Sequence, residues 1–340
     1  MKKTRCIWEQ PLSRAQALQV LVGGVALAGC GGGGGDGGSG SEYRRIYTFE
    51  AQTMTRIAIA PNGDIYDLDL EGNLVRFADF GRANNGRPVG MSTAFARPNA
   101  DANAFNALRL SVSPTNGQVY STQNGFVQVY RSTGEPLYQI RLHGRADTSD
   151  FIPQDVSVGN DGTVFVVNST FDTSDPQSYG AASYGAARPL RFSSEGELLS
   201  ALTLSPPTEN PSSLGGAGSV AAGPDSLYVA NRQLYHFSAQ GDALGLLSLR
   251  TTDGQISVLP AVPWLGTDAA GNIYVGPLYT RDQPAFLVYG ADGTLLRYWT
   301  PPHSPDYTFA VDAAGRLYFK VKQNEHDPLA VHVFAPSRPL

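Results

Sequence analysis

The sequence predicts an all-β fold made of repeated four-stranded units, and three observations carry this prediction. One pattern recurs six times: an apolar strand, a polar turn that usually ends in Gly, and a second strand that ends in an aromatic residue. Each copy is followed by an apolar run that also ends in an aromatic residue. No helical period of apolar residues occurs after residue 41. Short strands separated by Gly, Asn and Asp turns, repeated at this spacing, are typical of propeller blades.

The copies can be read in order along the chain. The first two strands of each unit are IAIAPNGDIY (57–66), LSVSPTNGQVY (110–120), VSVGNDGTVF (156–165), SVAAGPDSLY (219–228), LGTDAAGNIY (265–274) and FAVDAAGRLY (309–318). The third strands are LVRF (74–77), VQVY (127–130), PLRF (189–192), LYHF (234–237), FLVY (286–289) and VHVF (331–334). Units two to five continue into a turn and a further strand. Six units predict a six-bladed β-propeller of four-stranded blades; the alternative is a β-sandwich or an irregular all-β domain.

An N-terminal strand is expected to close the ring. The last unit ends at VHVFAPSRPL without a fourth strand, whereas RRIYTFEA (44–51) precedes the first unit. We expect residues 44–51 to complete the last blade, because closure removes an exposed sheet edge.

The innermost strands alternate large and small residues, as in Ile57/Ala58/Ile59 and Phe309/Ala310/Val311. A large row on one blade facing a small row on the next predicts that wedge-shaped sheets interlock.

Two of these units carry a family resemblance. LGTDAAGNIYV and FAVDAAGRLYF resemble the NHL-repeat unit, which reads roughly P-x-G-I-A-V-D-x-x-G-N-I-Y-V-A-D. The resemblance extends over residues 44–337 and implies a six-bladed propeller. Its motif describes turns and blade packing, and it implies no reaction.

Residues 1–29 are expected to be an export signal. Four basic residues precede or border an uncharged apolar run at 17–29 that is too short to span a membrane as a helix. The run ends in Leu27-Ala28-Gly29-Cys30, which resembles the bacterial lipobox. That resemblance implies that Cys30 carries a covalent diacylglycerol and that the chain is cut before it. The alternative is an ordinary secretory signal with an incidental cysteine.

Residues 30–41 are expected to be a tether, and residues 42–340 the propeller domain. Eight of the eleven residues from Gly31 to Ser41 are glycine, so this segment has no apolar side chains with which to build a core. The predicted location is the bacterial cell envelope, with the chain anchored in a membrane by lipid. Gly31, rather than Asp, follows the cysteine; by the enterobacterial sorting rule this favours the outer membrane.

Composition excludes some partners. Removing residues 1–29 takes away four basic residues and one acidic residue, which leaves 21 Lys and Arg against 29 Asp and Glu. A nucleic-acid partner is not expected, because it requires a basic face. Cys6 lies in the signal and Cys30 is the anchor, so no cysteine remains for a disulfide in the domain.

The ligand-binding face is predicted from loop length. The connections on one face of the ring are long, and they include segments 96–107, 143–153, 168–188, 205–217, 250–262, 276–285 and 301–306. Long loops often carry function. The residues that open the first strands rim the channel on this face, and they include Arg56, Arg109, Asp155, Trp264 and Tyr307. Such a set suits an anionic or sugar-like ligand. Alternatively, Asp155 neutralises an arginine and the aromatic residues plug the ring.

The sequence does not match a known catalytic pattern. A gluconolactonase-like site would place Glu, Asn and Asp around a divalent cation; Asp155, Asn168 and Asn231 fit, but no Glu opens a first strand. None of the five histidines opens a first strand either, so a zinc triad is not matched. We therefore expect no metal and no cofactor besides the lipid. The predicted function is a module that binds an envelope protein, peptide or glycan. The alternative is a divergent hydrolase or lyase, lactonase-like, and a divalent cation is expected only under that alternative.

Overall fold

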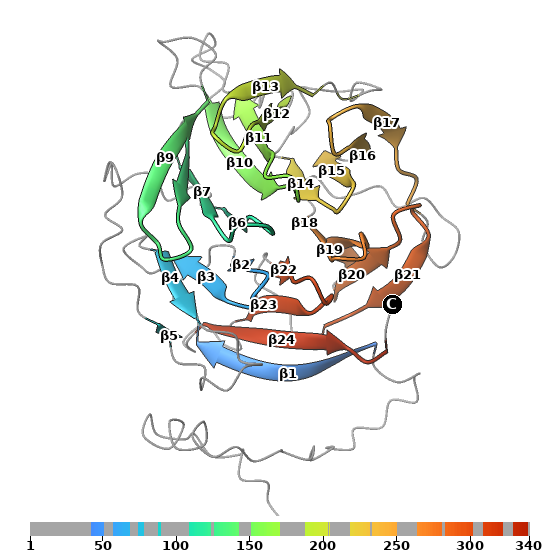
Figure 1. Ribbon diagram of the computed structural model, residues 1–340. Coiled ribbons are helices and arrows are strands. Elements are labelled where there is room, and N and C mark those ends of the chain that lie inside the picture. The colour runs from blue at the N-terminus through green and yellow to red at the C-terminus, as the bar shows by residue number, and fades with distance from the viewer. Residues whose placement is uncertain are drawn as a thin grey trace, which may run out of the picture.

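The computed structural model contains six separate four-stranded antiparallel sheets arranged around one axis (Figure 1). It describes residues 42–50, 57–68, 74–77, 88–89, 109–123, 126–142, 151–170, 188–202, 204, 218–231, 233–249, 264–280, 283–301, 309–321 and 329–338. The prediction of a six-bladed β-propeller is confirmed. Within these ranges no helix is long and apolar enough to cross a membrane.

The blades are numbered in chain order. Blade 1 contains β2 (Ala58–Ile59), β3 (Ile65–Leu68), β4 (Leu74–Phe77) and β5 (Pro88–Val89). Blade 2 contains β6 (Leu110–Val112), β7 (Val119–Gln123), β8 (Phe126–Tyr130) and β9 (Pro136–Arg141). Blade 3 contains β10 (Phe151–Val158), β11 (Val164–Thr170), β12 (Arg188–Phe192) and β13 (Leu198–Ala201). Blade 4 contains β14 (Ser219–Ala222), β15 (Ser226–Asn231), β16 (Gln233–Ser238) and β17 (Ala243–Leu246). Blade 5 contains β18 (Trp264–Thr267), β19 (Ile273–Thr280), β20 (Gln283–Tyr289) and β21 (Leu295–Trp299). Blade 6 contains β22 (Phe309–Val311), β23 (Leu317–Val321), β24 (Ala330–Pro336) and, as its outer strand, β1 (Tyr43–Glu50).

The first strand of each blade lies innermost, next to the axis. Contacts run from β2 to β6, β10, β14, β18 and β22 in turn, and β22 contacts β2 again. Blade 2 therefore lies opposite blade 5 across the channel (Figure 1). The turns between first and second strands and between third and fourth strands lie on one face of the ring, here called the turn face. The opposite face, where first strands begin, is called the loop face.

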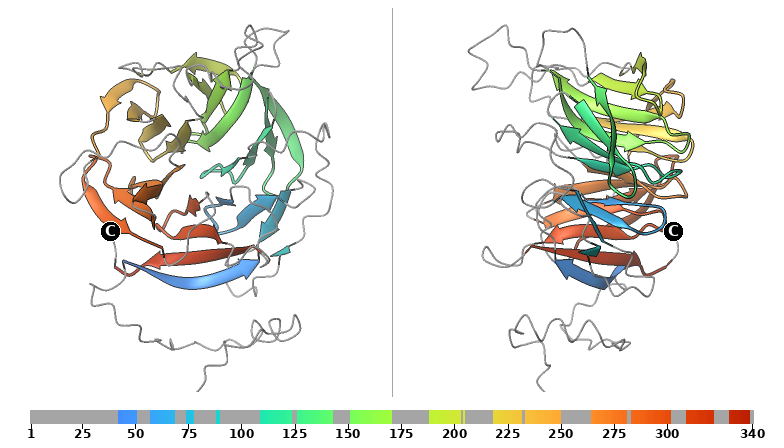
Figure 2. Two further views of the ribbon diagram at one scale, coloured as in Figure 1. Left: turned by 180° about the vertical axis from the view of Figure 1, so that it is seen from behind. Right: turned by 60° about the vertical axis from the view of Figure 1, so that its left-hand side comes forward.

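The N-terminal strand closes the ring as predicted. β1 pairs antiparallel with β24, from Tyr43 opposite Pro336 to Glu50 opposite Ala330. β1 lies on the outer side of β24 in every view (Figures 1 and 2). Beyond the strand, Ser337 N–H donates to the Glu42 carbonyl at 2.9 Å. Blade 6 is thus built from both ends of the described chain.

An arginine from blade 5 holds this closure. Arg297, on β21, donates from its guanidinium to the carbonyls of Glu42 and Arg338. Its Nε also lies 3.4 Å from a carboxylate oxygen of Glu42. The guanidinium therefore holds the first and last described segments of the domain against the neighbouring blade.

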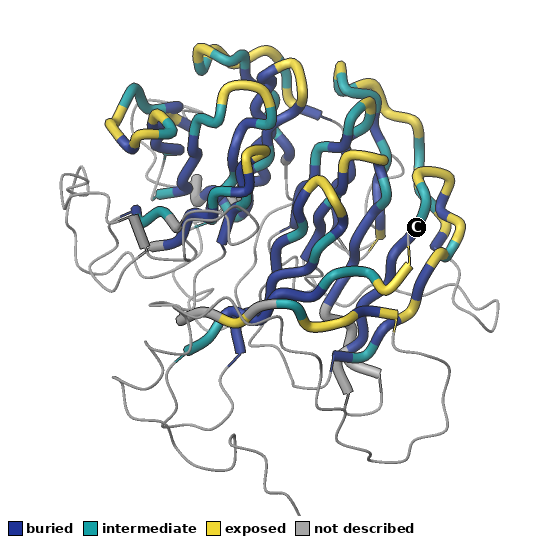
Figure 3. The backbone as a smooth tube through the Cα atoms, turned by 60° about the horizontal axis from the view of Figure 1, so that its bottom comes forward, coloured by how far each residue is buried: buried dark blue, intermediate teal, exposed yellow. Residues whose placement is uncertain are grey.

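The core lies between the blades rather than inside any one sheet. Each apolar cluster joins residues of adjacent blades, and the inner strands are mostly buried, while exposure concentrates at the turns and on the outermost strands (Figure 3). The predicted interlock of large and small rows is present. A Cβ at Gly266 of β18 would lie 2.5 Å from Cγ1 of Val311 on β22, so only the smallest residue fits there.

Aspartate holds the first turn in blades 5 and 6. Asp268 accepts hydrogen bonds from the backbone N–H groups of Ala270 (3.0 Å) and Asn272 (2.9 Å) and from the Tyr274 hydroxyl (3.0 Å). The equivalent donors to Asp312 are Ala314, Arg316 and Tyr318. Gly271 follows with φ = 81°, a conformation that glycine adopts without steric cost. The repeated D-A-A-G motif therefore encodes a turn.

Some details differ from the prediction. The predicted long connection at 276–285 is wrong, because β19 extends to Thr280 and β20 begins at Gln283, which makes a tight hairpin. Part of the predicted 143–153 connection is strand, since β10 already begins at Phe151. The fourth strand of blade 1, β5, was not predicted. The predicted 168–188 connection is strand at both ends, since β11 runs to Thr170 and β12 begins at Arg188. The rest of the long connections, apart from residue 301, the predicted signal at 1–29 and the predicted tether at 30–41 lie outside the described residues.

Candidate functional site

Arginine and tryptophan meet across the ring at the loop face. Arg109 directly precedes β6 of blade 2, and Trp264 opens β18 of blade 5, on the opposite side of the channel. The Arg109 guanidinium carbon lies 3.5 Å from the centroid of the Trp264 ring, which is a close cation–π contact. Arg109 Nε also donates to the Gln154 carbonyl of blade 3 at 3.2 Å. The Arg109–Trp264 pair, here called the spoke, therefore crosses the channel between two blades that are not neighbours.

Asp155 is fully buried and links three consecutive blades. One carboxylate oxygen accepts from the Ser219 hydroxyl (2.7 Å) and from Val220 N–H (3.0 Å) on blade 4. The Ser219 oxygen in turn accepts from Leu265 N–H of blade 5 at 3.1 Å. Buried carboxylates need such donors, because desolvation is otherwise costly. This network fixes the first strands of blades 3, 4 and 5 relative to one another.

Three of the five predicted rim residues are described, and they fall into two groups. Arg109 and Trp264 contact each other, and both are at least partly buried. Asp155 faces the blade interface and follows Gln154, whose carbonyl binds Arg109. Arg56, Tyr307 and Cys30 lie outside the described residues. The stack spans the channel between blades 2 and 5. The predicted role of the set in ligand binding stays a prediction.

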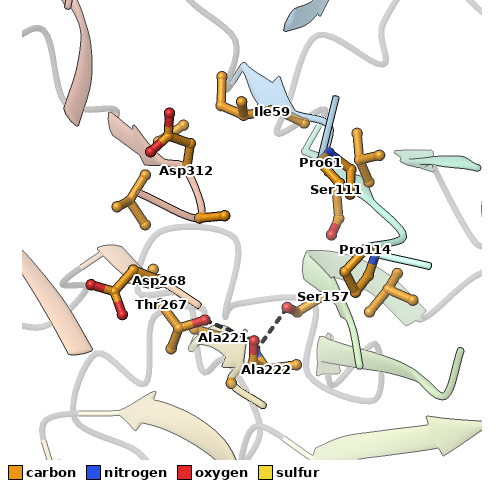
Figure 4. Close-up of a pocket in the computed structure, with 18 of the residues that line it drawn as sticks. Ile59, Pro61, Ser111, Pro114, Ser157, Ala221, Ala222, Thr267, Asp268 and Asp312 are labelled. Atoms are coloured by element: carbon orange, nitrogen blue, oxygen red, sulfur yellow. Dashed lines mark hydrogen bonds between the residues drawn. The ribbon is translucent and has the colours of Figure 1, made fainter. Parts of the chain in front are cut away.

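A cavity of about 370 Å³ occupies the channel on the other side of this spoke (Figure 4). All six first strands line it, and so do residues of all six turns on the turn face. Arg109 and Trp264 are not part of its lining, which places the cavity between the spoke and the turn face. The sequence predicted a ligand site at the loop face, because the long connections lie there. It did not predict this cavity near the turn face.

The described histidines lie on third strands, as predicted from their positions. His236 of β16 stacks on Tyr228 with ring centroids 5.0 Å apart, and its Nε2 lies 3.1 Å from the Ser226 hydroxyl. Burial lowers the pKa of His236. His332 of β24 is 2% exposed, within blade 6. In the described part of the chain, no group of three or more His, Cys, Asp or Glu side chains is arranged to hold a metal ion.

A buried ion pair between the first and last blades was also not predicted from the sequence. Lys320 Nζ of β23 lies 2.6 Å from a carboxylate oxygen of Asp67 on β3, and both side chains are almost fully buried. Burial lowers the pKa of Lys320, and the Asp67 charge opposes that shift. One hint was present in the sequence: Lys320 and Lys322 are the only lysines after residue 30, and Lys320 stands in an otherwise apolar strand.

Comparison with known proteins relates the chain to solved structures by fold. A gluconolactonase from Xanthomonas campestris is 14% identical with a TM-score of 0.52, over 86% of this chain and 96% of that protein. A putative gluconolactonase is 16% identical with a TM-score of 0.54, over 89% and 94%. A calcium-binding protein, regucalcin, from Agrobacterium tumefaciens is 14% identical with a TM-score of 0.50, over 84% and 92%. At these identities the likeness establishes a shared fold and nothing further.

The chain matches no protein-family model and no curated protein. The NHL-repeat resemblance therefore stays a prediction.

Proposed function

We propose that this chain is a lipid-anchored propeller of the bacterial cell envelope that binds an anionic or sugar-like group at its loop face. The Arg109–Trp264 stack carries the proposal. A guanidinium offers paired donors to a carboxylate, and the Trp264 ring on which it stacks, 9% exposed, supports it from one side. Stacking also pre-orients the guanidinium, which reduces the entropy lost on binding. The natural ligand would be such a group on an envelope glycan, peptide or protein.

The location rests on the sequence. The apolar run, the Leu-Ala-Gly-Cys box at 27–30 and the glycine-rich segment that follows agree with an acylated, tethered protein. The Cys30→Ser variant tests the anchor: we expect release of the protein from washed membranes into the soluble envelope fraction. Retention of the variant in membranes would count against acylation at this residue.

Tryptophan fluorescence tests binding. Of the three tryptophans, only Trp264 and Trp299 follow residue 30, and both belong to the apolar cluster between blades 5 and 6, but Trp264 is the one that stacks on Arg109. Titration with glucuronate, compared with uncharged glucose, should change the emission of Trp264 in a saturable way. Arg109→Gln should abolish the response to glucuronate. Arg131→Gln should not, because Arg131 is exposed on an outer turn of the same blade and pairs only locally with Glu135.

A second candidate function is hydrolysis of a lactone, and the fold comparison favours it. Two solved structures of similar fold are gluconolactonases, one of them putative, and a third is a calcium-binding protein. Metal analysis, melts with and without Ca²⁺ and Zn²⁺, and an assay with glucono-δ-lactone test this alternative. A stoichiometric metal with turnover would establish an enzyme, and would replace the binding module as the function of this chain.

A further inference from the structure

We propose that the channel cavity at the turn face is a second ligand site, specific for an uncharged small molecule with an apolar body and a hydroxyl or carbonyl end. This site is separate from the loop-face site proposed above, because the Arg109–Trp264 spoke lies between them. The ligand would enter from the turn face.

The mouth of the cavity is built from rigid, small residues. Each of the six first turns contributes one residue to it, namely Pro61, Pro114, Asn160, Pro224, Ala269 and Ala313. Three prolines fix their local backbone, so this opening needs little ordering when a ligand binds. The volume of about 370 Å³ falls within the range of small-molecule sites. Cavity size and shape therefore suit a slender organic molecule.

The apolar wall comes from side chains of four consecutive blades. Ile59 of blade 1, Val112 of blade 2, Val158 of blade 3 and Val311 of blade 6 all line the cavity. Apolar lining of this kind stabilises the hydrocarbon part of a ligand, because its transfer from water is favourable.

Three hydroxyl groups, from blades 2, 3 and 5, also line the cavity (Figure 4). Ser157 Oγ accepts from Ala222 N–H at 2.9 Å, which leaves its own proton to donate. Thr267 Oγ1 donates to the Ala222 carbonyl at 2.7 Å, which leaves its lone pairs to accept. The Ser111 hydroxyl has no hydrogen-bond partner among the described residues, although it is half-buried. Together they can pair with a ligand hydroxyl or carbonyl.

The charge of the lining excludes an ionic ligand. No Lys, Arg or His lines the cavity, so an anion would find no counter-charge there. Asp268 and Asp312 do line it, but their carboxylates point away from its centre (Figure 4). Each already accepts bonds from its turn and from a tyrosine hydroxyl. An anion would therefore lose hydration without compensation, and a cation would meet only carboxylates that point away and are already hydrogen-bonded.

Three probes with the same six-carbon chain and head groups of different charge test this inference: 1-hexanol, hexanoate and hexylammonium. Isothermal titration would use the chain from residue 30 onward with Cys30→Ser, which retains the tether and all six blades and needs no detergent. We expect saturable, one-to-one binding of 1-hexanol, and at least tenfold weaker binding of both ions. Equal binding of the ions would overturn the assigned ligand class. No binding of 1-hexanol would show a cavity that holds only water, and would overturn the site.

Variants locate the binding. Ser111→Ala removes a hydroxyl with little change in volume, and it should weaken 1-hexanol binding about five- to tenfold. Ala222→Leu should abolish binding by filling the cavity. The control Ser194→Ala makes the same chemical change on an exposed outer turn of blade 3 and should have no effect. Thermal melts confirm that each variant is folded. If Ser111→Ala binds 1-hexanol as tightly as the parent, the hydroxyl anchor is wrong, and the proposed ligand class falls with it.

Discussion

Single small residues on the innermost strands set how closely the blades approach. At Gly266 even a methyl group would overlap Val311 of the next blade, with a Cβ to Cγ1 distance of 2.5 Å. Overpacking of a rigid core typically costs about 1–3 kcal/mol. We therefore expect Gly266→Ala to lower the free energy of unfolding by about that amount in urea denaturation. Gly223→Ala is the matched control, since a Cβ there would make only ordinary contacts of 3.5 Å or more. Equal stability of the two variants would contradict this explanation of the interlock.

Buried tyrosines make the fold sensitive to high pH. Burial raises the pKa of Tyr43, Tyr130 and Tyr289 from 10.0 to about 12. The folded state therefore retains protons that the unfolded chain releases, and this contribution to stability is complete below pH 10 and is lost as the pH rises towards 12. We expect unfolding, followed by circular dichroism, to accompany the later part of tyrosinate formation. Full tyrosine ionisation near pH 10 with an unchanged dichroism spectrum would contradict it.

At the scale of elements, β3 and β23 contact each other across the boundary between the first and last blades, here called the seam. Their buried Asp67–Lys320 pair spans that seam at 2.6 Å. Removing one partner leaves a buried charge, so Asp67→Asn should destabilise the fold by about 3–5 kcal/mol. Replacing both, as Asp67→Leu with Lys320→Met, should recover most of the loss, because apolar packing avoids the desolvation cost. Urea unfolding of the two single variants and the double variant measures the coupling. Purely additive losses would show that the pair does not act as a unit.

The same elements show what the sequence could and could not reveal. First, second and third strands were predictable, because apolar runs with aromatic ends and Gly turns are local signals. β5 was missed because its two residues, Pro88 and Val89, carry no period. The Asp67–Lys320 pair joins residues 253 positions apart, and the Arg109–Trp264 stack joins opposite blades. Only the closed ring brings these residues together. The turn-face cavity was missed for the same reason, since its lining is collected from all six blades.

At the scale of the whole molecule, ring closure depends on one strand from outside the repeats. β1 supplies the outer strand of blade 6, and Tyr43 of β1 packs in the cluster that also contains Trp299 and Phe334. Deleting residues 44–51 should therefore leave an open sheet edge and lower the melting temperature by several degrees or abolish folding. A deletion variant that melts at the parent temperature would contradict the importance of this closure.

The Ser337–Glu42 hydrogen bond also has a practical consequence for rearranging the chain. Because that bond is 2.9 Å long, a short peptide can join the two segments without disturbing blade 6. New ends can then be opened at an outer turn of another blade, such as the one at the exposed Glu195 of blade 3. A circular permutant of this kind would keep every described strand pairing while moving the N-terminus of the domain, and with it the proposed lipid anchor, from blade 6 to blade 3. The orientation of the ring on a surface would then become a variable that an experimenter can set.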